Sequence, residues 1–384
     1  MKYRKFGKLD WKVSALGFGA MRLPRTGGNP ADVDEPESIR MIRYAIDNGV
    51  NYLDTAYPYH SGQSECIVGR ALQDGYRERI KLATKLPARL VESTQDFDRY
   101  FNEQLERLQT ERIDFYLLHG LNDRTWPKVR DMGVLRWTEA QMTKGCIGHL
   151  GFSFHDDYEV FKEIVNAYDN WTLSQVLYNY MDVDYQAGRR GVEYAAGKGL
   201  AVVVMEPLRG GGLSKEPPEQ VARAWGSATQ NRSPVEWALL WVWNKPEVSV
   251  ALSGMSTMEQ VVENVAIADN SGPDMLTTDE MTLIAHVREA CQELSPIPCT
   301  NCGYCIPCPN GVEIPSIFKI YSEAMIYDDH RRGYLRYAGG ASELKEEQRA
   351  DQCIDCGECL EVCPQEIAIP EWLKKAHDLL MSSQ

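Results

Sequence analysis

Two cysteine runs near the C-terminal end constrain what this chain can fold into more than any other feature. The chain has 384 residues and 11 cysteines, and eight of the cysteines stand in these runs. The runs are Cys299-x2-Cys302-x2-Cys305-x2-Cys308 and Cys353-x2-Cys356-x2-Cys359-x3-Cys363. Cytosolic cysteines rarely form stable disulfides, so clustered ones indicate a metal site. A C-x2-C-x2-C loop can place three thiolates around one face of an iron–sulfur cubane, and two runs therefore predict two 4Fe–4S clusters.

Zinc is the alternative metal for clustered cysteines. Zinc sites use paired C-x2-C knuckles separated by a longer gap, whereas this chain has four cysteines within ten residues. The spacing therefore favours iron–sulfur clusters over zinc. The pattern departs from the usual bacterial one at Cys308, which follows x2 where the usual spacing is x3. The three remaining cysteines, Cys66, Cys146 and Cys291, stand apart, and we expect them to be packing residues.

Roughly residues 295–370 resemble the dicluster bacterial-type ferredoxin fold. The resemblance implies crossed ligation, in which the fourth cysteine of each run binds the other cluster. One cluster would then be held by Cys299, Cys302, Cys305 and Cys363, and the other by Cys353, Cys356, Cys359 and Cys308. Within this resemblance, Gly303 and Gly357 would allow tight turns near the sulfurs, and the residues that shield the clusters from water would be Ile306, Ile354 and Ile367. A helix is expected between the runs, at 317–328.

The first 270 or so residues alternate short apolar runs with longer amphipathic segments. The expected strands are 13–18, 50–54, 81–85, 113–119, 147–153, 173–177, 200–205 and 248–252, each followed by a helix. Continuous apolar strands are typical of a sheet covered on both faces. Eight successive βα units predict an α/β fold, a (β/α)8 TIM barrel over 1–275. We expect a connecting helix at 276–294 and a small α+β ferredoxin-like domain at 295–384. A doubly wound open sheet is the alternative, but its G-x-G-x-x-G motif is missing after the first strand.

The charge and hydropathy of the chain exclude some classes of function. The formal net charge is −14, so no basic surface for nucleic acid is expected. No run of about 18 apolar residues predicts a membrane span, and the polar N-terminal segment predicts no signal peptide, which indicates a cytoplasmic protein. The acidity fits plain solubility, and it also fits docking to a basic redox partner. A redox protein of ferredoxin or flavodoxin type is a separate candidate partner of the clusters.

Four polar residues fall at, or just after, the C-terminal ends of successive expected strands: Asp54, Tyr59, Lys85 and His119. Barrel enzymes place their chemistry on that face. A carboxylate keeps a nearby lysine charged, and the lysine lowers the pKa of a neighbouring phenol. The phenol can then give a proton to a developing alkoxide while the histidine polarises the carbonyl group. The pattern predicts acid catalysis on a carbonyl, with Tyr57 as the rival to Tyr59.

The segments Gly17-Phe18-Gly19, Asp54-Thr55-Ala56-Tyr57-Pro58-Tyr59, Thr84-Lys85 and Leu118-His119 resemble the aldo-keto reductase family over roughly 1–270. The resemblance implies the four residues as a catalytic tetrad with Tyr59 as the acid, a small carbonyl or alcohol substrate, and NAD(P)H. The implied cofactor-binding residues are Gly19, Ser153, Gln175, Met205, Pro207, Leu208, Ser253, Gly254, Met255, Gln260, Glu263 and Asn264.

The chain departs from the family pattern at three points of the cofactor site. Phe154 stands where the family usually has asparagine, and Met205 where it usually has the tyrosine that stacks on the nicotinamide. The family often has a basic residue for the 2′-phosphate of NADP, and none occurs between Ser253 and Asn264. We expect the substrate pocket to be lined by Tyr57, Trp126 and the 209–213 loop.

The two parts of the chain differ in the number of electrons that they transfer. A nicotinamide moves two electrons as hydride, whereas a 4Fe–4S cluster normally moves one, and a flavin is the usual converter. Three hypotheses follow. The barrel reduces a carbonyl with NAD(P)H while the clusters are structural or serve docking; the groove holds a flavin that the clusters feed; or the clusters reduce the substrate directly while the tetrad supplies protons. A non-catalytic electron-carrier subunit, with the barrel as a scaffold, is the remaining alternative.

Overall fold

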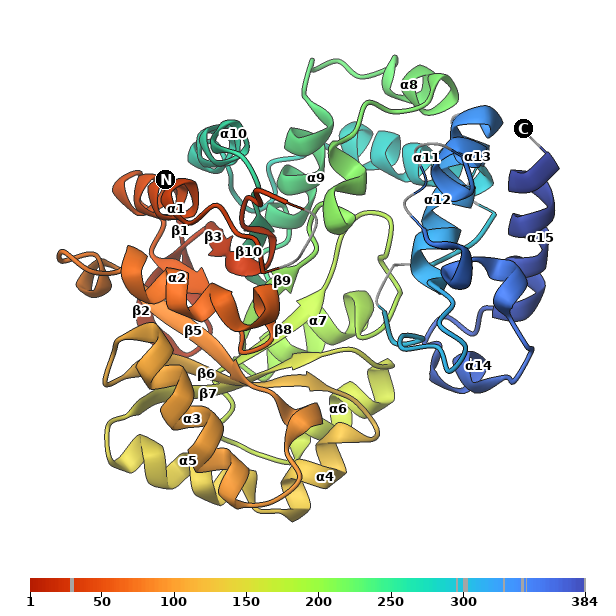
Figure 1. Ribbon diagram of the computed structural model, residues 1–384. Helices are drawn as coiled ribbons and strands as arrows, with labels where there is room; N and C mark the ends of the chain where they lie inside the picture. The colour runs from red at the N-terminus through yellow and green to blue at the C-terminus, as the bar shows by residue number, and fades with distance from the viewer. Residues whose placement is uncertain are drawn as a thin grey trace. The chain divides into compact units, whose positions relative to one another are not determined.

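The computed structural model describes residues 1–27, 31–294, 296–299, 303–326, 329–339, 342 and 344–382. The chain divides into two compact units (Figure 1). The barrel unit comprises 1–215 and 231–278, and the cysteine unit comprises 216–230 and 279–384. The boundary near residue 278 lies close to the one expected from the sequence, but the segment 216–230 within the expected barrel belongs to the cysteine unit.

Eight parallel strands close into a barrel, in the order β10-β3-β4-β5-β6-β7-β8-β9. The strands are β3 (Leu16–Gly19), β4 (Tyr52–Asp54), β5 (Lys81–Leu86), β6 (Ile113–Leu121), β7 (Ile147–Phe154), β8 (Leu173–Leu177), β9 (Ala201–Met205) and β10 (Val248–Gly254). Most strand residues are buried, as expected for strands between a packed interior and a helical layer. The (β/α)8 barrel is therefore confirmed, and the open doubly wound sheet is excluded.

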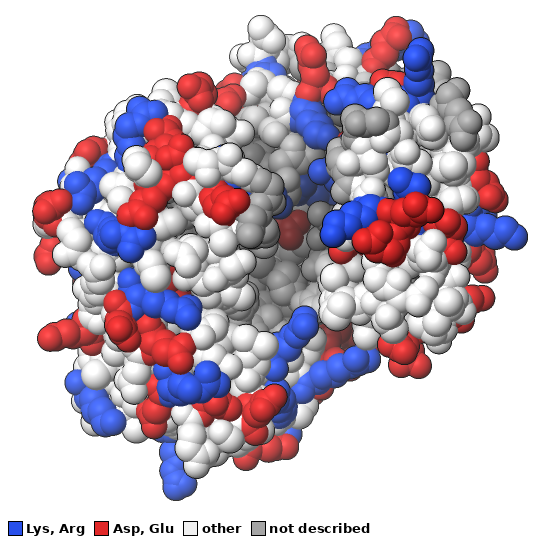
Figure 2. Space-filling view, in the orientation of Figure 1, with Lys and Arg blue, Asp and Glu red and all other residues white. Residues whose placement is uncertain are grey.

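A layer of helices surrounds the strands (Figure 1). The helices are α1 (Glu35–Asp47), α2 (Gln63–Ala71), α3 (Gln95–Leu108), α4 (Thr125–Asp131), α5 (Val134–Thr143), α6 (Tyr158–Asn166), α7 (Gly188–Gly197), α9 (Pro234–Trp243) and α10 (Met258–Asp269). Several begin at a side-chain cap, as where Asp157 accepts from the backbone N–H groups of Glu159 and Val160. Lysine, arginine and carboxylate side chains are interspersed on the visible face of this unit (Figure 2).

The bottom of the barrel is closed by an antiparallel hairpin of β1 (Tyr3–Phe6) and β2 (Leu9–Ser14). Phe6 packs inside the barrel, where its ring lies 5.8 Å from the ring of Tyr52 and 4.8 Å from that of Phe115. The sequence predicts a single strand over 13–18, and this prediction is wrong because the chain breaks at Ala15, between β2 and β3. Ser14 Oγ donates a hydrogen bond to the Leu16 carbonyl across that break.

The cysteine unit is helical in the described residues. Its helices are α8 (Glu219–Trp225), α11 (Thr278–Leu294), α12 (Ile314–Ile326), α13 (His330–Tyr337), α14 (Glu358–Val362) and α15 (Ile369–Ser382). Its core contains apolar residues of α12 and α15, among them Phe318 and Leu373. The expected helix at 317–328 is present as α12, whereas the described residues of this unit include no strand, although the sequence predicts an α+β domain. Across the described part of the chain, no helix is both long and apolar enough to span a membrane.

Candidate active site and cysteine sites

The structure brings the four predicted catalytic residues together at the C-terminal mouth of the barrel. Asp54 ends β4, Lys85 and His119 lie in β5 and β6, and Tyr59 begins the short helix η2 (Tyr59–Gly62). Lys85 Nζ donates to Asp54 Oδ1 at 2.6 Å and lies 3.4 Å from Tyr59 Oη. The rings of Tyr59 and His119 are 5.9 Å apart and nearly perpendicular. The side chains that the strand-end pattern selects therefore form one constellation.

Burial and the ion pair together set the protonation of this constellation. Lys85 is fully buried, which disfavours its charge, but Asp54 and Tyr59 raise its pKa above the ordinary value, so the ammonium keeps its proton. Burial raises the pKa of Tyr59, and the Lys85 cation offsets only part of that rise. The sequence-based expectation of a lowered phenol pKa is therefore wrong in its net direction. A raised pKa keeps the phenol protonated, as a proton donor requires.

His119 carries a neutral imidazole. Burial lowers its pKa well below the ordinary value, and the cation of Lys85 lowers it further. A neutral imidazole can polarise a carbonyl group by donating a hydrogen bond, without giving up a full proton. The protonated phenol of Tyr59 and the neutral imidazole of His119 thus differ in the chemistry that each can offer.

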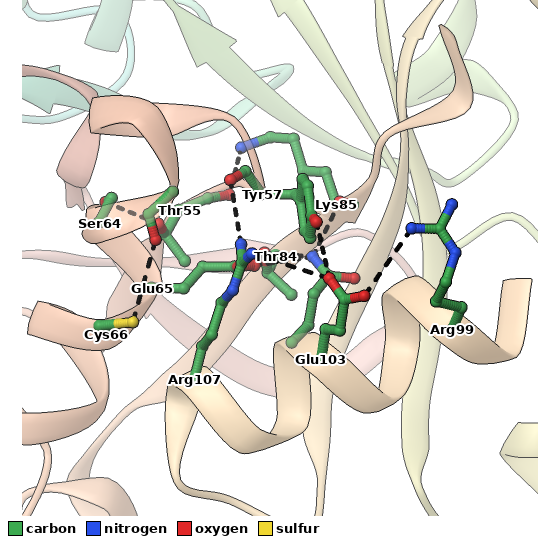
Figure 3. Close-up of polar contacts among 12 residues, drawn as sticks. Thr55, Tyr57, Ser64, Glu65, Cys66, Thr84, Lys85, Arg99, Glu103 and Arg107 are labelled. Atoms are coloured by element: carbon green, nitrogen blue, oxygen red, sulfur yellow. Dashed lines mark hydrogen bonds and ion pairs between the residues drawn. The ribbon is translucent and has the colours of Figure 1, made fainter. Parts of the chain in front are cut away.

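Tyr57, the rival to Tyr59, is engaged on the outside of the barrel. Its Oη donates to Glu103 Oε2 of α3 at 2.7 Å, and the guanidinium of Arg107 lies 4.1 Å from the centre of its ring. Figure 3 shows Tyr57 among these α3 side chains. This arrangement leaves Tyr59 as the phenol beside Lys85. Trp126 is only 1% exposed and packs near Trp171, and its place in the substrate pocket stays a prediction.

A buried polar network braces β5 behind the tetrad (Figure 3). Its centre is Glu65 of α2, which accepts hydrogen bonds from Thr84 Oγ1 at 2.6 Å and from Gln104 Nε2 at 2.7 Å. Gln104 Nε2 also donates to the backbone carbonyl of Lys85 at 3.0 Å, and Arg107 Nη1 lies 3.3 Å from Glu65. These contacts fix the strand that carries Lys85. The network joins residues from three segments, so no local sequence signal indicates it.

The nicotinamide end of the predicted cofactor site lies on β7 and β8. Ser153 and Gln175 are neighbours in register on these strands. Ser153 Oγ accepts from the Gly120 N–H at 2.8 Å, while Gln175 Oε1 is buried and has no hydrogen-bond partner in the described part of the chain. An unsatisfied buried oxygen is costly, and the amide of a nicotinamide would satisfy it. Phe154 is buried against Phe161 of α6 and serves packing, and Met205 is partly exposed at the end of β9.

The adenosine end of the predicted site lies at the ends of β9, β10 and β3, which are adjacent strands. Gly19 and Gly254 are partners in the β3–β10 register. Asn264 Nδ2 donates to Ser253 Oγ at 3.0 Å, and both side chains are buried, so Asn264 supports the site from inside. Gln260 accepts a hydrogen bond from the Ser256 N–H. The other predicted residues of this end differ in exposure: Met255 and Pro207 are buried, Leu208 is partly exposed and Glu263 is exposed.

A basic residue from elsewhere in the chain reaches this end of the site. The carbonyl of Arg22 accepts from Ser256 Oγ at 2.8 Å. The stem of Arg22 lies against Gly254, where a Cβ atom would come within 3.1 Å of it, so a larger residue would force the Arg22 side chain to shift. Arg22 ends η1 (Ala20–Arg22) and is thus a basic residue near this segment that does not come from 253–264. The sequence analysis missed Arg22 because more than 200 positions separate it from its partners.

Glu206 is a second titratable residue that the sequence analysis missed. It directly follows Met205 and has a left-handed backbone, with φ of 54°. Burial, together with the nearby Asp182, raises the pKa of Glu206 to about 7, although Arg22 and Arg209 act in the opposite direction. Arg209 Nε lies 3.2 Å from Asp182 Oδ2, so both arginines belong to a charged group beside the mouth of the barrel.

The described cysteines of the two runs fall into two groups. Cys299, Cys305 and Cys363 line one pocket. Burial and the neighbouring Cys353, Cys356 and Cys308 raise the pKa of Cys359 to about 11, which places these four thiols near one another. Cys302 lies outside the described residues. Among the residues that the structure describes, no three His, Cys, Asp or Glu side chains are grouped as ligands of a single ion.

The apolar residues near the cysteines are not equally buried. Ile367 is 5% exposed and packs in the core of the cysteine unit, whereas Ile354 is 64% exposed. The prediction that Ile354 shields a cluster is therefore wrong. The loop that carries it has left-handed backbones at Asp355 and Gly357, with φ of 54° and 79°, and its apolar side chain faces solvent.

The fold and the site define an oxidoreductase-type barrel with an attached cysteine-rich unit. The chain belongs to the aldo/keto reductase family, whose family model matches residues 15–289. The model of a 4Fe-4S dicluster domain matches residues 298–368. The chain is thus an oxidoreductase of this family with a C-terminal 4Fe-4S domain, as the sequence predicts.

Relatives and solved structures match a large part of the chain. An uncharacterized oxidoreductase of Bacillus subtilis is 25% identical over 71% of this chain and 92% of its own length. L-galactose dehydrogenase of Arabidopsis thaliana is 27% identical over 74% of this chain and 94% of its own length. Among solved structures, the holo form of an aldo-keto reductase from Bacillus halodurans is 30% identical, covers 75% of this chain and 96% of its own, and has a TM-score of 0.63.

Proposed function

We propose that the barrel reversibly reduces a small carbonyl compound to an alcohol with NAD(P)H, and that Tyr59 is the general acid. The observation that carries this proposal is Lys85 Nζ, which lies 2.6 Å from Asp54 Oδ1 and 3.4 Å from Tyr59 Oη in a buried site. A bound nicotinamide supplies or accepts the hydride. Tyr59 gives its Oη proton to the developing alkoxide, and the Lys85 cation stabilises the resulting phenolate. His119, as a neutral imidazole, orients and polarises the carbonyl oxygen.

The residues present suit a nicotinamide dinucleotide. Gln175 offers an unpaired buried oxygen to the carboxamide, with Ser153 beside it. At the other end, α10 begins at the Thr257 N-cap, and a helix N-terminus favours phosphate groups. Arg22 adds a positive charge there, so the absence of a basic residue between 253 and 264 does not argue against NADP.

We further propose that the two 4Fe–4S clusters are bound by the crossed sets of cysteines. Cys299, Cys305 and Cys363 line one pocket, and the run spacing adds Cys302 to that set. The second set consists of Cys353, Cys356, Cys359 and Cys308. Cysteine thiols release their protons when they bind a metal centre, and four grouped cysteines are the usual ligand set of a 4Fe–4S cluster. In the cytoplasm such thiols remain reduced, and the clusters would exchange single electrons with a redox protein.

The test of the barrel assignment is Tyr59→Phe, which removes the proton and keeps the ring. We expect kcat/KM for carbonyl reduction to fall about 10²–10⁴-fold with unchanged cluster absorbance. The matched control is Tyr57→Phe, which should change kcat/KM less than about twofold, since its hydroxyl bonds to α3. Unchanged reduction in Tyr59→Phe would contradict the tetrad assignment. A large loss with intact clusters would contradict the electron-carrier alternative.

A flavin in the barrel groove is the second candidate, and the replacement of the stacking tyrosine by Met205 favours it. Purification without oxygen, followed by iron, sulfide and released-cofactor analysis, separates the candidates. About eight irons per chain are expected for two 4Fe–4S clusters, and about four would contradict the two-cluster assignment. Released FMN or FAD would support the flavin. Oxidation of NADH by a ketone in a single turnover, with no flavin released, would exclude it.

A further inference from the structure

The two cysteine groups differ in their exposure. The pocket lined by Cys299, Cys305 and Cys363 has apolar walls, which include Ile314 and Phe318, each 1% exposed. The other group opens to solvent at Cys356, which is an exposed residue. A cluster in the first position is enclosed by the core of the cysteine unit, whereas one in the second position lies at the surface.

Two large apolar side chains are exposed beside the open group. Ile354 is 64% exposed and adjoins Cys353, and Leu360 is 44% exposed and adjoins Cys359. Single exposed apolar residues are common on protein surfaces and need no explanation. Here Ile354 and Leu360 each stand next to a cysteine of the same group, and both lie within the seven residues 354–360, which include the start of α14. We call Ile354, Asp355, Glu358, Leu360 and Glu361, with Cys356 between them, the α14 face.

The charged residues that neighbour this apolar pair in the sequence have one sign. Between residues 350 and 373 the sequence has six carboxylates and neither lysine nor arginine. All six are exposed: Asp351, Asp355, Glu358, Glu361, Glu366 and Glu371. At the place of α14, Figure 2 shows white surface edged by red carboxylates. This distribution contrasts with the interspersed charges of the barrel face.

We propose that the α14 face is the docking surface for a basic one-electron carrier protein, and that electrons pass through the cluster of Cys353, Cys356, Cys359 and Cys308. The proposal rests on the cluster assignment made above. A transient redox complex needs a small interface, complementary charge for fast encounter and close approach to the cluster. In each encounter the reduced cluster loses one electron, the oxidised centre of the carrier gains it, and no bond or proton changes place.

The test uses cytochrome c as the basic one-electron probe. The holoprotein is reduced with dithionite, and the second-order rate of cytochrome c reduction is followed by stopped flow at low and high salt. The triple variant Asp355→Asn/Glu358→Gln/Glu361→Gln should react about tenfold more slowly at low salt. At high salt the difference should shrink to less than about twofold, because added ions screen surface charge. A changed cluster potential would instead slow the reaction at both salt concentrations.

The matched control is Glu78→Gln/Glu92→Gln/Glu111→Gln, which changes three exposed carboxylates of the barrel unit. Both triple variants move the net charge by the same three units, from −14 to −11. The control should react within about twofold of the unchanged protein at low salt, because its charges lie outside the docking surface. An equal loss in both variants would overturn the proposal, since it would reflect net charge alone.

A second readout does not depend on electron transfer. Carbodiimide joins carboxylates to lysines in direct contact, so cross-links to cytochrome c should map to Asp355, Glu358 and Glu361. Cross-links spread evenly over the carboxylates of the chain would overturn the docking surface. Iron content is measured first, because it distinguishes failure of the docking proposal from failure of the cluster assignment. A protein with its full iron that shows no effect of the α14 variant overturns the docking proposal alone, whereas a protein without iron overturns the cluster assignment.

Discussion

The mouth of the barrel and the cysteine unit reach their functional geometry in different ways. In the barrel, Lys85 and Asp54 bind each other in a buried site, and Gln104 bonds to the backbone of Lys85 from behind. The cysteines of the other unit are half-buried or exposed thiols, and the described ones form no single-ion group. The comparison suggests that protein packing alone prepares the first site, whereas the second requires its inorganic centre to become rigid.

Removal of iron should give the largest difference between the barrel and the cysteine unit. Stripping the protein of iron with a chelator under reducing conditions should unfold the cysteine unit and leave the barrel folded, because the small core of that unit depends on cluster ligation. Limited proteolysis should then cut beyond residue 279 and within 216–230, while the barrel segments 1–215 and 231–278 resist cleavage. Iron-loaded protein is the control. Simultaneous loss of both units would show that the barrel also depends on the clusters.

The substitution Lys85→Met tests whether the barrel site is prepared by its ion pair. We expect kcat/KM for carbonyl reduction to fall about 10²–10⁴-fold, because the phenol loses the cation that stabilises its deprotonated form. Stability should also fall by about 3–5 kcal/mol, since Asp54 is left buried without its partner. The double variant Asp54→Asn/Lys85→Met should regain much of the stability, measured by urea unfolding, without regaining activity. Recovery of both would contradict the role of Lys85.

A smaller effect concerns Glu206 at the edge of the barrel mouth. Its pKa is raised from the ordinary 4.5 to about 7, so between these pH values the folded chain keeps a proton that the unfolded chain has released. Stability therefore decreases as pH rises through this window, by up to about 3 kcal/mol, and the loss persists above pH 7. Glu206→Gln removes this dependence. Its melting temperature should exceed that of the unchanged protein by several degrees at pH 8 and match it near pH 5; an offset that is constant with pH would exclude the prediction.

Much of the fold and the tetrad could be predicted because the relevant signals are local. Apolar strand runs alternate with amphipathic helices, and the strand-end rule selects Asp54, Lys85 and His119 without knowledge of distant contacts. The spacing of the cysteines is also a local signal, and it predicts the 4Fe–4S domain. Arg22 and Glu206 were missed because their environments come from segments far apart in the sequence.

Two errors have a common physical cause. The position of Lys85 beside Tyr59 was predicted, but the larger effect of burial on the phenol was not, so the direction of the pKa shift was wrong. Ile354 is apolar and adjoins a ligand cysteine, but the sequence does not state which side of its loop faces water. In both cases the chemical type of the residue was read correctly, and its exposure depended on the tertiary structure.

The aromatic packing inside the hairpin end of the barrel has a consequence for proton supply. Tyr52 lies two residues before Asp54 on β4, so both side chains project to the same side of the strand. The rings of Phe6, Tyr52 and Phe115 therefore form a packed aromatic layer beneath the ion pair. If Tyr59 is the proton donor, we expect its proton to be replaced from the C-terminal mouth rather than through this layer. The aromatic layer thus predicts that substrate, product and the returning proton all use the same open end of the barrel.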